Sequence, residues 1–171
     1  MTISIGVIGA GTMGNGIAQT ASGAEFDVVM CDVKPELVER GLANIGKSLD
    51  RFVKKETMTE EQRSKILGRI KVTTELNDLK ECALVVEAAT ENFEIKKSIF
   101  QQLDSICGPD AILSSNTSSI SITKIAAVTA RPDRVIGMHF FNPVPLMKLV
   151  EVIRGIATSD ETYATVKQLS E

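Results

Sequence analysis

The sequence has few of the residues that mark secreted, metal-bound or membrane-spanning proteins. Its 171 residues include no tryptophan, one tyrosine, one histidine and three cysteines. The cysteines, Cys31, Cys82 and Cys107, are odd in number, far apart and set among apolar residues, so we expect reduced, buried thiols and neither a disulfide nor a metal framework. No apolar run approaches the ~18 residues of a membrane span. The N-terminus lacks the basic segment of a secretory signal, and we therefore expect a cytoplasmic protein.

Neither sign of charge is in large excess. The chain has 22 Asp and Glu against 19 Lys and Arg, which gives a formal net charge of −3. A nucleic-acid-binding surface is strongly basic, so we expect no nucleic-acid partner. With 43% hydrophobic and 24% charged residues, the composition is typical of a soluble globular domain that buries most of its apolar surface.

Short apolar runs alternate with longer helical segments along the chain. Strands are predicted at 3–8, 26–32, 70–74, 83–88, 111–116, 134–140 and 148–153, and helices at 12–23, 35–57, 92–107, 121–129 and from Ser159 onward. The run at 83–88 is interpreted as fully apolar, as in a strand covered on both faces. We predict an α/β fold: one doubly wound, Rossmann-type domain over residues 1–171 with a mostly parallel sheet.

A helical arm is predicted as an insertion at about 35–67. Pro35 suits the first position of a long amphipathic helix. Thr59 and Gln62 have the spacing of a capping box that opens a second, shorter helix. Two helices between successive strands exceed what a crossover needs, so we expect this segment to project from the body.

The first strand ends in a glycine-rich turn, Gly9-Ala10-Gly11-Thr12-Met13-Gly14, which leads directly into a helix. Gly9 permits a tight turn, Gly11 lets the backbone approach a phosphate, and Gly14 allows close helix–strand packing. Free N–H groups at the helix start favour an anion. The alternative is a turn without a ligand, but the strand–turn–helix context favours a dinucleotide.

Asp32 ends the second predicted strand, 18 positions after Gly14. A carboxylate there accepts hydrogen bonds from the ribose hydroxyls of NAD and repels a 2′-phosphate. The other interpretation is a turn residue ahead of Pro35. Lys34 leaves NADP open, but NAD is favoured.

His139 is the only histidine and falls at the end of a predicted parallel strand, the edge where open α/β sheets bind ligands. If the chain folds back about Pro145 as an antiparallel strand, His139 and Glu151 face each other. A carboxylate on one ring nitrogen fixes the tautomer and makes the other nitrogen a general base. The alternatives are a structural histidine and an exposed strand glutamate. A nicotinamide site beside such a pair implies hydride transfer coupled to proton transfer from an alcohol.

The segment from Ser115 to Ser119 follows another strand and is expected to meet the same crevice. Its hydroxyl and amide groups suit a ribose, a nicotinamide or a substrate oxygen. Capping of the helix at 121 is the alternative.

Four segments resemble the N-terminal, NAD-binding domain of the L-3-hydroxyacyl-CoA dehydrogenases, and most closely its short-chain bacterial members. They are VIGAGTMGNGIAQ, VVEAATENFEIKKSIF, SSNTSSISIT and GMHFFNPVPLMKLVEVIRGIATS. The resemblance implies interconversion of 3-hydroxyacyl-CoA and 3-ketoacyl-CoA in fatty acid or butanoate metabolism, in particular reduction of acetoacetyl-CoA to 3-hydroxybutyryl-CoA.

The resemblance also implies residue roles. His139 is the general acid or base, Glu151 its partner, and Ser118 a hydrogen-bond donor to the substrate 3-oxygen beside the nicotinamide. Residues implied to line the cofactor site are Glu91, Lys96, Asn116, Ser118 and Asn142. From their spacing alone, Glu91 and Lys96 favour an exposed pair at a helix start.

The arm of this family binds coenzyme A, and here it carries Ser48, Arg51, Lys54 and Lys55. Basic side chains suit the phosphates of CoA. A solvated helix face is the alternative for each of them. Lys54 and Lys55 are adjacent and cannot share one helix face, and alignment with the family favours Lys55.

The family continues into a helical second domain that completes the active site and forms most of a homodimer interface, and we expect this chain to lack it. Two other functions stay open. One is an NAD-binding module without turnover, and the other is a dehydrogenase of free β-hydroxy acids.

Overall fold

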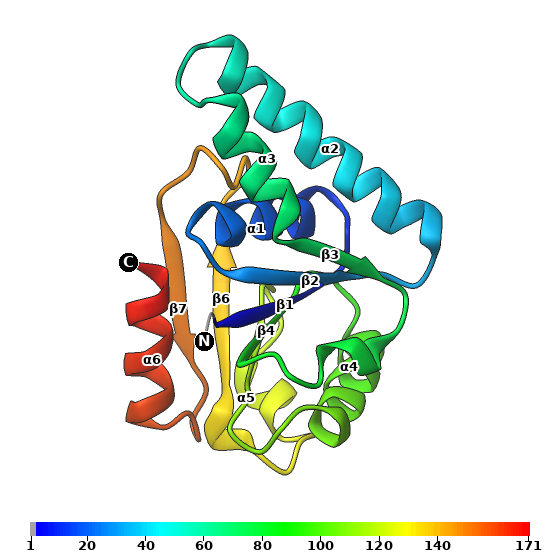
Figure 1. Ribbon diagram of the computed structural model, residues 1–171. Coiled ribbons are helices and arrows are strands. Elements are labelled where there is room, and N and C mark those ends of the chain that lie inside the picture. The colour runs from blue at the N-terminus through cyan, green and yellow to red at the C-terminus, as the bar shows by residue number, and fades with distance from the viewer. Residues whose placement is uncertain (1–2) are drawn as a thin grey trace.

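The computed structural model describes residues 3–171 and shows a seven-stranded sheet with helices on both faces (Figure 1). The strands are β1 (Ser4–Ile8), β2 (Asp27–Cys31), β3 (Ile70–Thr73), β4 (Leu84–Glu87), β5 (Ile112–Ser115), β6 (Val135–Phe140) and β7 (Val150–Arg154). The helices are α1 (Thr12–Gly23), α2 (Pro35–Lys54), α3 (Glu60–Gly68), α4 (Phe93–Ile106), α5 (Ile122–Ala126) and α6 (Asp160–Ser170), with short 3-10 turns η1 (Leu76–Leu79) and η2 (Pro132–Arg134).

The sheet has the order β3-β2-β1-β4-β5-β6-β7. All neighbours are parallel except β6 and β7, which are antiparallel. The chain winds outward from β1 in one direction and from β4 in the other, so the strand order reverses between β1 and β4. Ligands bind at such a switch point in open α/β sheets. The predicted doubly wound fold is confirmed.

Each face of the sheet has its own apolar core. Alternate strand residues such as Val7 and Ile136 pack under α1, α2, α3 and α6, whereas Val85 and Leu113 pack under α4 and α5. This two-sided burial explains why central strands such as β4 and β5 are short, mostly apolar runs, since all their residues are buried. None of the helices within residues 3–171 combines the length and the apolar character needed to cross a bilayer.

The segment after β2 forms an antiparallel pair of helices whose connection lies beyond the sheet (Figure 1). Pro35 occupies the first turn of α2, and Thr59 and Gln62 form the predicted capping box at the start of α3. The base of α2 lies directly on the glycine-rich turn, because a Cβ on Gly41 would lie 2.8 Å from the carbonyl oxygen of Ala10. Packing continues along α2 as far as Leu49, which is fully buried, whereas residues 54–57 at the connection are exposed.

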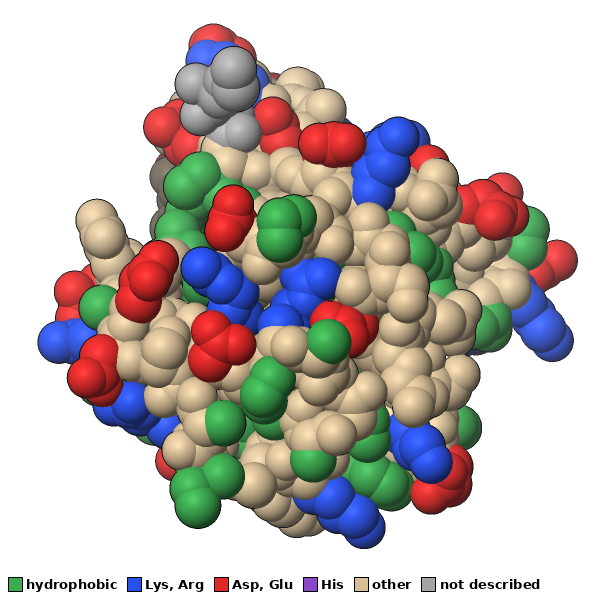
Figure 2. All heavy atoms as spheres, turned by 90° about the horizontal axis from the view of Figure 1, so that it is seen from below, with side chains coloured by type: hydrophobic (Ala, Val, Ile, Leu, Met, Phe, Trp, Pro, Cys, Tyr) green, Lys and Arg blue, Asp and Glu red, His purple; other side chains and the backbone are tan. Residues whose placement is uncertain are grey.

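Charges of both signs are interleaved on the face that Figure 2 shows, with small apolar patches between them. A partly buried ion pair joins Arg131, whose Nε lies 2.7 Å from Oδ1 of Asp104. The guanidinium also donates to carbonyl oxygens near the end of α4. It therefore ties that helix end to the chain that leads into η2.

Candidate active site

The glycine-rich turn has the geometry expected of a phosphate-binding loop. Gly9 has a φ of 95°, a left-handed conformation that side chains disfavour. A Cβ on Gly14 would overlap the carbonyl oxygen of Gly9, so α1 and β1 can pack closely only with glycine there. At Gly11, by contrast, an added Cβ would meet no atom of residues 3–171 within 4 Å. This openness leaves the backbone accessible to a ligand.

The helix that follows begins without a side-chain cap. Gly11 is its N-cap, and the first turn contains no acidic residue within the described chain. Thr12 is exposed and Met13 is half-buried. The first N–H groups of a helix have no intrahelical partner and attract negative charge. The residues present therefore fit a pyrophosphate.

Asp32 lies at the end of β2 beside this turn. Its Oδ2 accepts a hydrogen bond of 2.7 Å from the N–H of Ala10, and its Oδ1 accepts one of 2.7 Å from the N–H of Val33. Each oxygen keeps a further acceptor site. The carboxylate thus fixes the glycine-rich turn and still has acceptor capacity for a ribose hydroxyl.

A cavity of about 920 Å³ opens at the carboxyl ends of β1, β2 and β4. It is lined on one side by Gly9, Gly11 and Asp32, and on the other by Ala89 in the loop after β4 and by Ile95 in the first turn of α4. It therefore occupies the topological switch point, where a dinucleotide is expected. Within residues 3–171 no three His, Cys, Asp or Glu side chains are grouped as metal ligands would be.

His139 and Glu151 face each other across β6 and β7, as the folding about Pro145 predicts. Nδ1 of His139 lies 2.8 Å from Oε2 of Glu151. A carboxylate can only accept, so Nδ1 carries the proton and Nε2 of the neutral ring holds the lone pair. The ring of Phe141 packs against the imidazole at a centroid distance of 4.8 Å. The imidazole of His139 is thus held by the Glu151 carboxylate and by the Phe141 ring.

The turn after β5 is tied to β6. Oδ1 of Asn116 accepts a hydrogen bond of 2.8 Å from the N–H of Phe140, the residue after His139. Thr117 caps the turn by accepting from the N–H groups of Ser119 and Ile120. The N-cap of α5 is Ser121, which lies just after the segment from Ser115 to Ser119. The ligand-binding role of that segment stays a prediction. Ser118 is exposed.

Glu91 and Lys96 are not the exposed pair that their spacing alone favours. Lys96 is 1% exposed, and its Nζ lies 2.8 Å from both oxygens of Glu87 and 3.6 Å from Oε1 of Glu91. Desolvation acts to raise the pKa of Glu91, but hydrogen bonds from Thr117 and Ser119 and the charge of Lys96 bring that pKa below its ordinary value. The Glu91 carboxylate is therefore ionised at neutral pH.

Glu87 is the residue that the sequence analysis missed. The run at 83–88 was interpreted as fully apolar, but Glu87 has no exposed surface and sits at the carboxyl end of β4. An acidic residue within an apolar strand sequence indicates a buried ion pair, because a buried charge requires a partner. The partner, Lys96, lies nine residues away on α4.

The remaining predicted residues lie on accessible surface. Asn142 is exposed just after β6. On the arm, Ser48 is half-buried, whereas Arg51, Lys54 and Lys55 are exposed near the end of α2. Lys55 is the C-cap of that helix, one residue beyond its last turn.

The three cysteines are free and buried, as predicted. Desolvation is the main cause that raises the pKa of Cys31 and of Cys107 to about 11, and it also raises the pKa of Cys82. Cys31 lines the cavity beside Asp32. The thiols are therefore protonated at neutral pH and act as small apolar groups.

A family model described as 3-hydroxyacyl-CoA dehydrogenase, NAD binding domain, matches residues 4–171. The chain belongs to this family. A 3-hydroxybutyryl-CoA dehydrogenase from Bradyrhizobium diazoefficiens is 53% identical over 164 residues, which are 96% of this chain and 56% of that protein. A protein of the same description from Clostridioides difficile is 47% identical over 99% of this chain and 60% of its own length. The resemblance noted in the sequence is confirmed.

Solved structures agree with this membership. The crystal structure of (S)-3-hydroxybutyryl-CoA dehydrogenase from Ralstonia eutropha has a TM-score of 0.97 and 54% identity, and the match covers 99% of this chain and 60% of that one. The chain thus spans roughly three-fifths of the length of these relatives. NAD binding belongs to the matched domain itself.

Proposed function

We propose that the protein interconverts 3-hydroxyacyl-CoA and 3-ketoacyl-CoA with NAD, and that acetoacetyl-CoA and 3-hydroxybutyryl-CoA are its preferred pair. The observation that carries this proposal is the hydrogen bond between His139 and Glu151 at the sheet edge of a domain of this family. The names of the relatives support the choice of substrate.

The chemistry assigned to His139 is proton transfer at Nε2. In the oxidation direction, Nε2 takes the proton of the 3-hydroxyl while the C3–H bond breaks with its electron pair and the C=O bond forms. NAD supplies the hydride acceptor. Glu151 accepts from Nδ1 throughout and stabilises the imidazolium that results. In reduction the same nitrogen returns the proton to the 3-oxygen.

The other site residues are assigned to binding. Ser118 is assigned to donate to the 3-oxygen, Asn142 to contact the nicotinamide ribose region, and Asp32 to accept from the adenosine ribose. Asn116 is a further candidate in the same crevice. The glycine-rich turn holds the pyrophosphate, Glu91 is assigned to the cofactor site, and Lys96 lies buried behind Glu91. On the arm, the residues assigned to the phosphates of coenzyme A are Ser48, Arg51, Lys54 and Lys55.

We also propose that turnover needs a second, helical domain that covers the substrate and forms a homodimer. The share of the relatives' length that this chain spans supports this. On this proposal the 171-residue chain binds NADH but reduces acetoacetyl-CoA poorly. Near-normal turnover by the purified chain would contradict the need for the second domain.

A steady-state assay tests the reaction itself. A protein that joins this chain to the second domain is given acetoacetyl-CoA with either NADH or NADPH. We expect turnover with NADH and little with NADPH. Turnover of free 3-hydroxybutyrate but not of its CoA thioester would favour a β-hydroxy acid dehydrogenase, and NADH binding without turnover of either would favour a binding module.

A further inference from the structure

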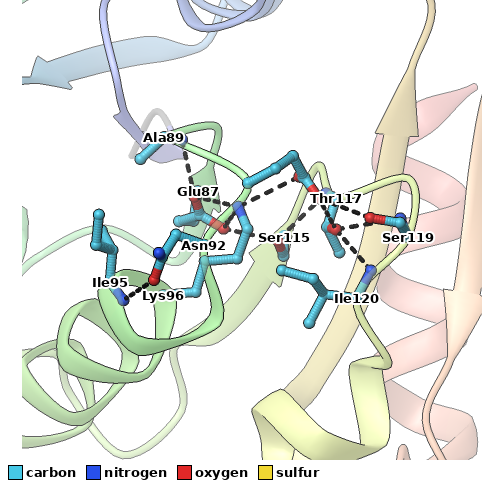
Figure 3. Close-up of polar contacts among 10 residues, drawn as sticks. Glu87, Ala89, Asn92, Ile95, Lys96, Ser115, Thr117, Ser119 and Ile120 are labelled. Atoms are coloured by element: carbon cyan, nitrogen blue, oxygen red, sulfur yellow. Dashed lines mark hydrogen bonds and ion pairs between the residues drawn. The ribbon is translucent and has the colours of Figure 1, made fainter.

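Four hydrogen bonds converge on the buried carboxylate of Glu87 (Figure 3). Lys96 donates to both oxygens at 2.8 Å. The N–H of Ala89 donates to Oε1 at 2.7 Å, and the hydroxyl of Ser115 donates to Oε2 at 2.6 Å. The three donor groups come from the loop after β4, from α4 and from the end of β5, so one side chain joins three segments.

The Lys96 ammonium group extends this connection to Glu91. Oε2 of Glu91 accepts hydrogen bonds from Thr117 at 2.8 Å and from Ser119 at 3.0 Å. Lys96 therefore lies between a wholly buried carboxylate and one whose side chain is 47% exposed. The exposed carboxylate holds the turn at 115–120, and the buried one holds the lysine.

These hydrogen bonds engage all but one of the polar side chains at 115–119. Ser115, Thr117 and Ser119 donate to Glu87 or Glu91, and Asn116 accepts from the backbone of Phe140. Of the polar residues at 115–119, Ser118 alone makes no side-chain hydrogen bond to any of residues 3–171. The network therefore selects which hydroxyl of the turn is presented to a ligand.

We propose that Glu87 is a positioning residue, which presents Ser118 through Lys96 and Glu91 and shapes the cofactor cleft through Ala89. The effect on the cleft follows from Ala89, which lines the cavity and is held by Glu87. The effect on Ser118 follows from its two neighbours, which Glu91 holds. This inference rests on the proposed function only in assigning the substrate 3-oxygen to Ser118.

The substitution Glu87→Gln tests this role at nearly constant volume. Glutamine has one acceptor oxygen, so either orientation turns its NH2 group toward Lys96 and toward one further donor. Lys96 is then left with Glu91 as its single anionic partner, and we expect it to draw this carboxylate toward itself and away from Thr117 and Ser119, which donate to the other oxygen. We expect the turn at 115–120 to loosen as a result.

Two measurements on the 171-residue chain report this loosening, since both apolar cores lie within it. Hydrogen exchange at the amides of Thr117, Ser119 and Ile120, which are bonded within the turn, is expected to speed up about tenfold or more. The Kd for NADH is expected to rise about tenfold. Asp104→Asn is the matched control, because it removes the charge of another partly buried ion pair, that of Arg131.

A second variant separates positioning from general stability. In Glu87→Gln/Lys96→Gln the buried charges are both removed, so we expect Tm to recover toward the wild-type value while exchange at the turn and NADH affinity stay impaired. Recovery of all three would overturn the proposal, and so would a single variant whose exchange and Kd match those of Asp104→Asn. Neither readout uses an acyl-CoA, so failure here is distinct from an absence of turnover with acetoacetyl-CoA.

Discussion

The antiparallel register of β6 and β7 places Glu151 directly opposite His139, with Nδ1 of the imidazole 2.8 Å from the carboxylate. The two residues are twelve positions apart and meet because the chain reverses direction between the strands. A rigid sheet, rather than a loop, therefore sets the geometry of the proposed acid–base pair.

Replacement of the histidine tests proton transfer. His139→Gln is expected to lower kcat for acetoacetyl-CoA reduction by about 10²- to 10⁴-fold, because general acid–base catalysis supplies that range. NADH affinity, measured by fluorescence titration, should stay near the wild-type value, since this side chain lies outside the glycine-rich turn. A kcat within a few-fold of wild type would reduce His139 to a structural role.

Removal of the carboxylate tests orientation. Glu151→Ala takes away the acceptor that keeps the proton on Nδ1, so we expect kcat to fall by at least about 10²-fold. Glu151→Gln keeps an acceptor oxygen without the charge and should lose less. Equal losses in the two variants would show that the negative charge alone matters, and no loss in either would contradict the assigned role.

Two glycines of the turn provide a matched pair of alanine variants. Gly14→Ala forces a methyl group onto the carbonyl of Gly9 and is expected to cost about 1–3 kcal/mol of unfolding free energy. Gly11→Ala meets open space, so its Tm should match wild type while the Kd for NADH rises. Unchanged NADH affinity in Gly11→Ala would contradict close approach of a phosphate at this residue.

The cysteines predict a pH dependence of stability. In the folded chain, burial raises the pKa of the Cys31 and Cys107 thiols to about 11 from an ordinary value of 9.0. The unfolded chain therefore releases these protons first, and the free energy of unfolding should fall between about pH 9 and 11 but not below. Denaturant titrations at pH 8 and 10 measure this, with Cys31→Ala/Cys107→Ala as the control expected to lose much of the slope.

The arm is tested by a pair of lysine variants. Lys55→Ala is expected to raise KM for acetoacetyl-CoA several-fold with little change in kcat, because it removes only a charge that binds phosphate. Lys65→Ala is the matched control: its ammonium is on α3 and pairs with Glu61 at 2.7 Å. If Lys55→Ala leaves KM unchanged while Lys54→Ala or Arg51→Ala raises it, the preference for Lys55 is wrong.

Local rules predicted much of this fold because the deciding contacts are short in sequence or set by strand register. Pro35 begins α2, Thr59 and Gln62 cap α3, and the hairpin about Pro145 brings His139 to Glu151. The roles of these residues in binding and catalysis stay predictions.

The buried network could not be predicted in the same way. Glu87 looks like one polar letter in an apolar strand, and Lys96 looks like a solvated helix residue, until the packing of α4 brings them within 2.8 Å. Ser115 reaches the same carboxylate from 28 positions away. Periodicity reports which face of an element is apolar, but it does not report which buried charges share a partner.

Asp32 has a consequence for changing the coenzyme preference of this chain. Its carboxylate is at once the acceptor expected for the ribose and the group that holds the N–H of Ala10 in the glycine-rich turn. Swapping Asp32 for a small neutral residue to admit a 2′-phosphate would therefore also release the turn that holds the pyrophosphate. A redesign toward NADPH would need another acceptor for the N–H of Ala10. Coenzyme selectivity and pyrophosphate binding must therefore be engineered together.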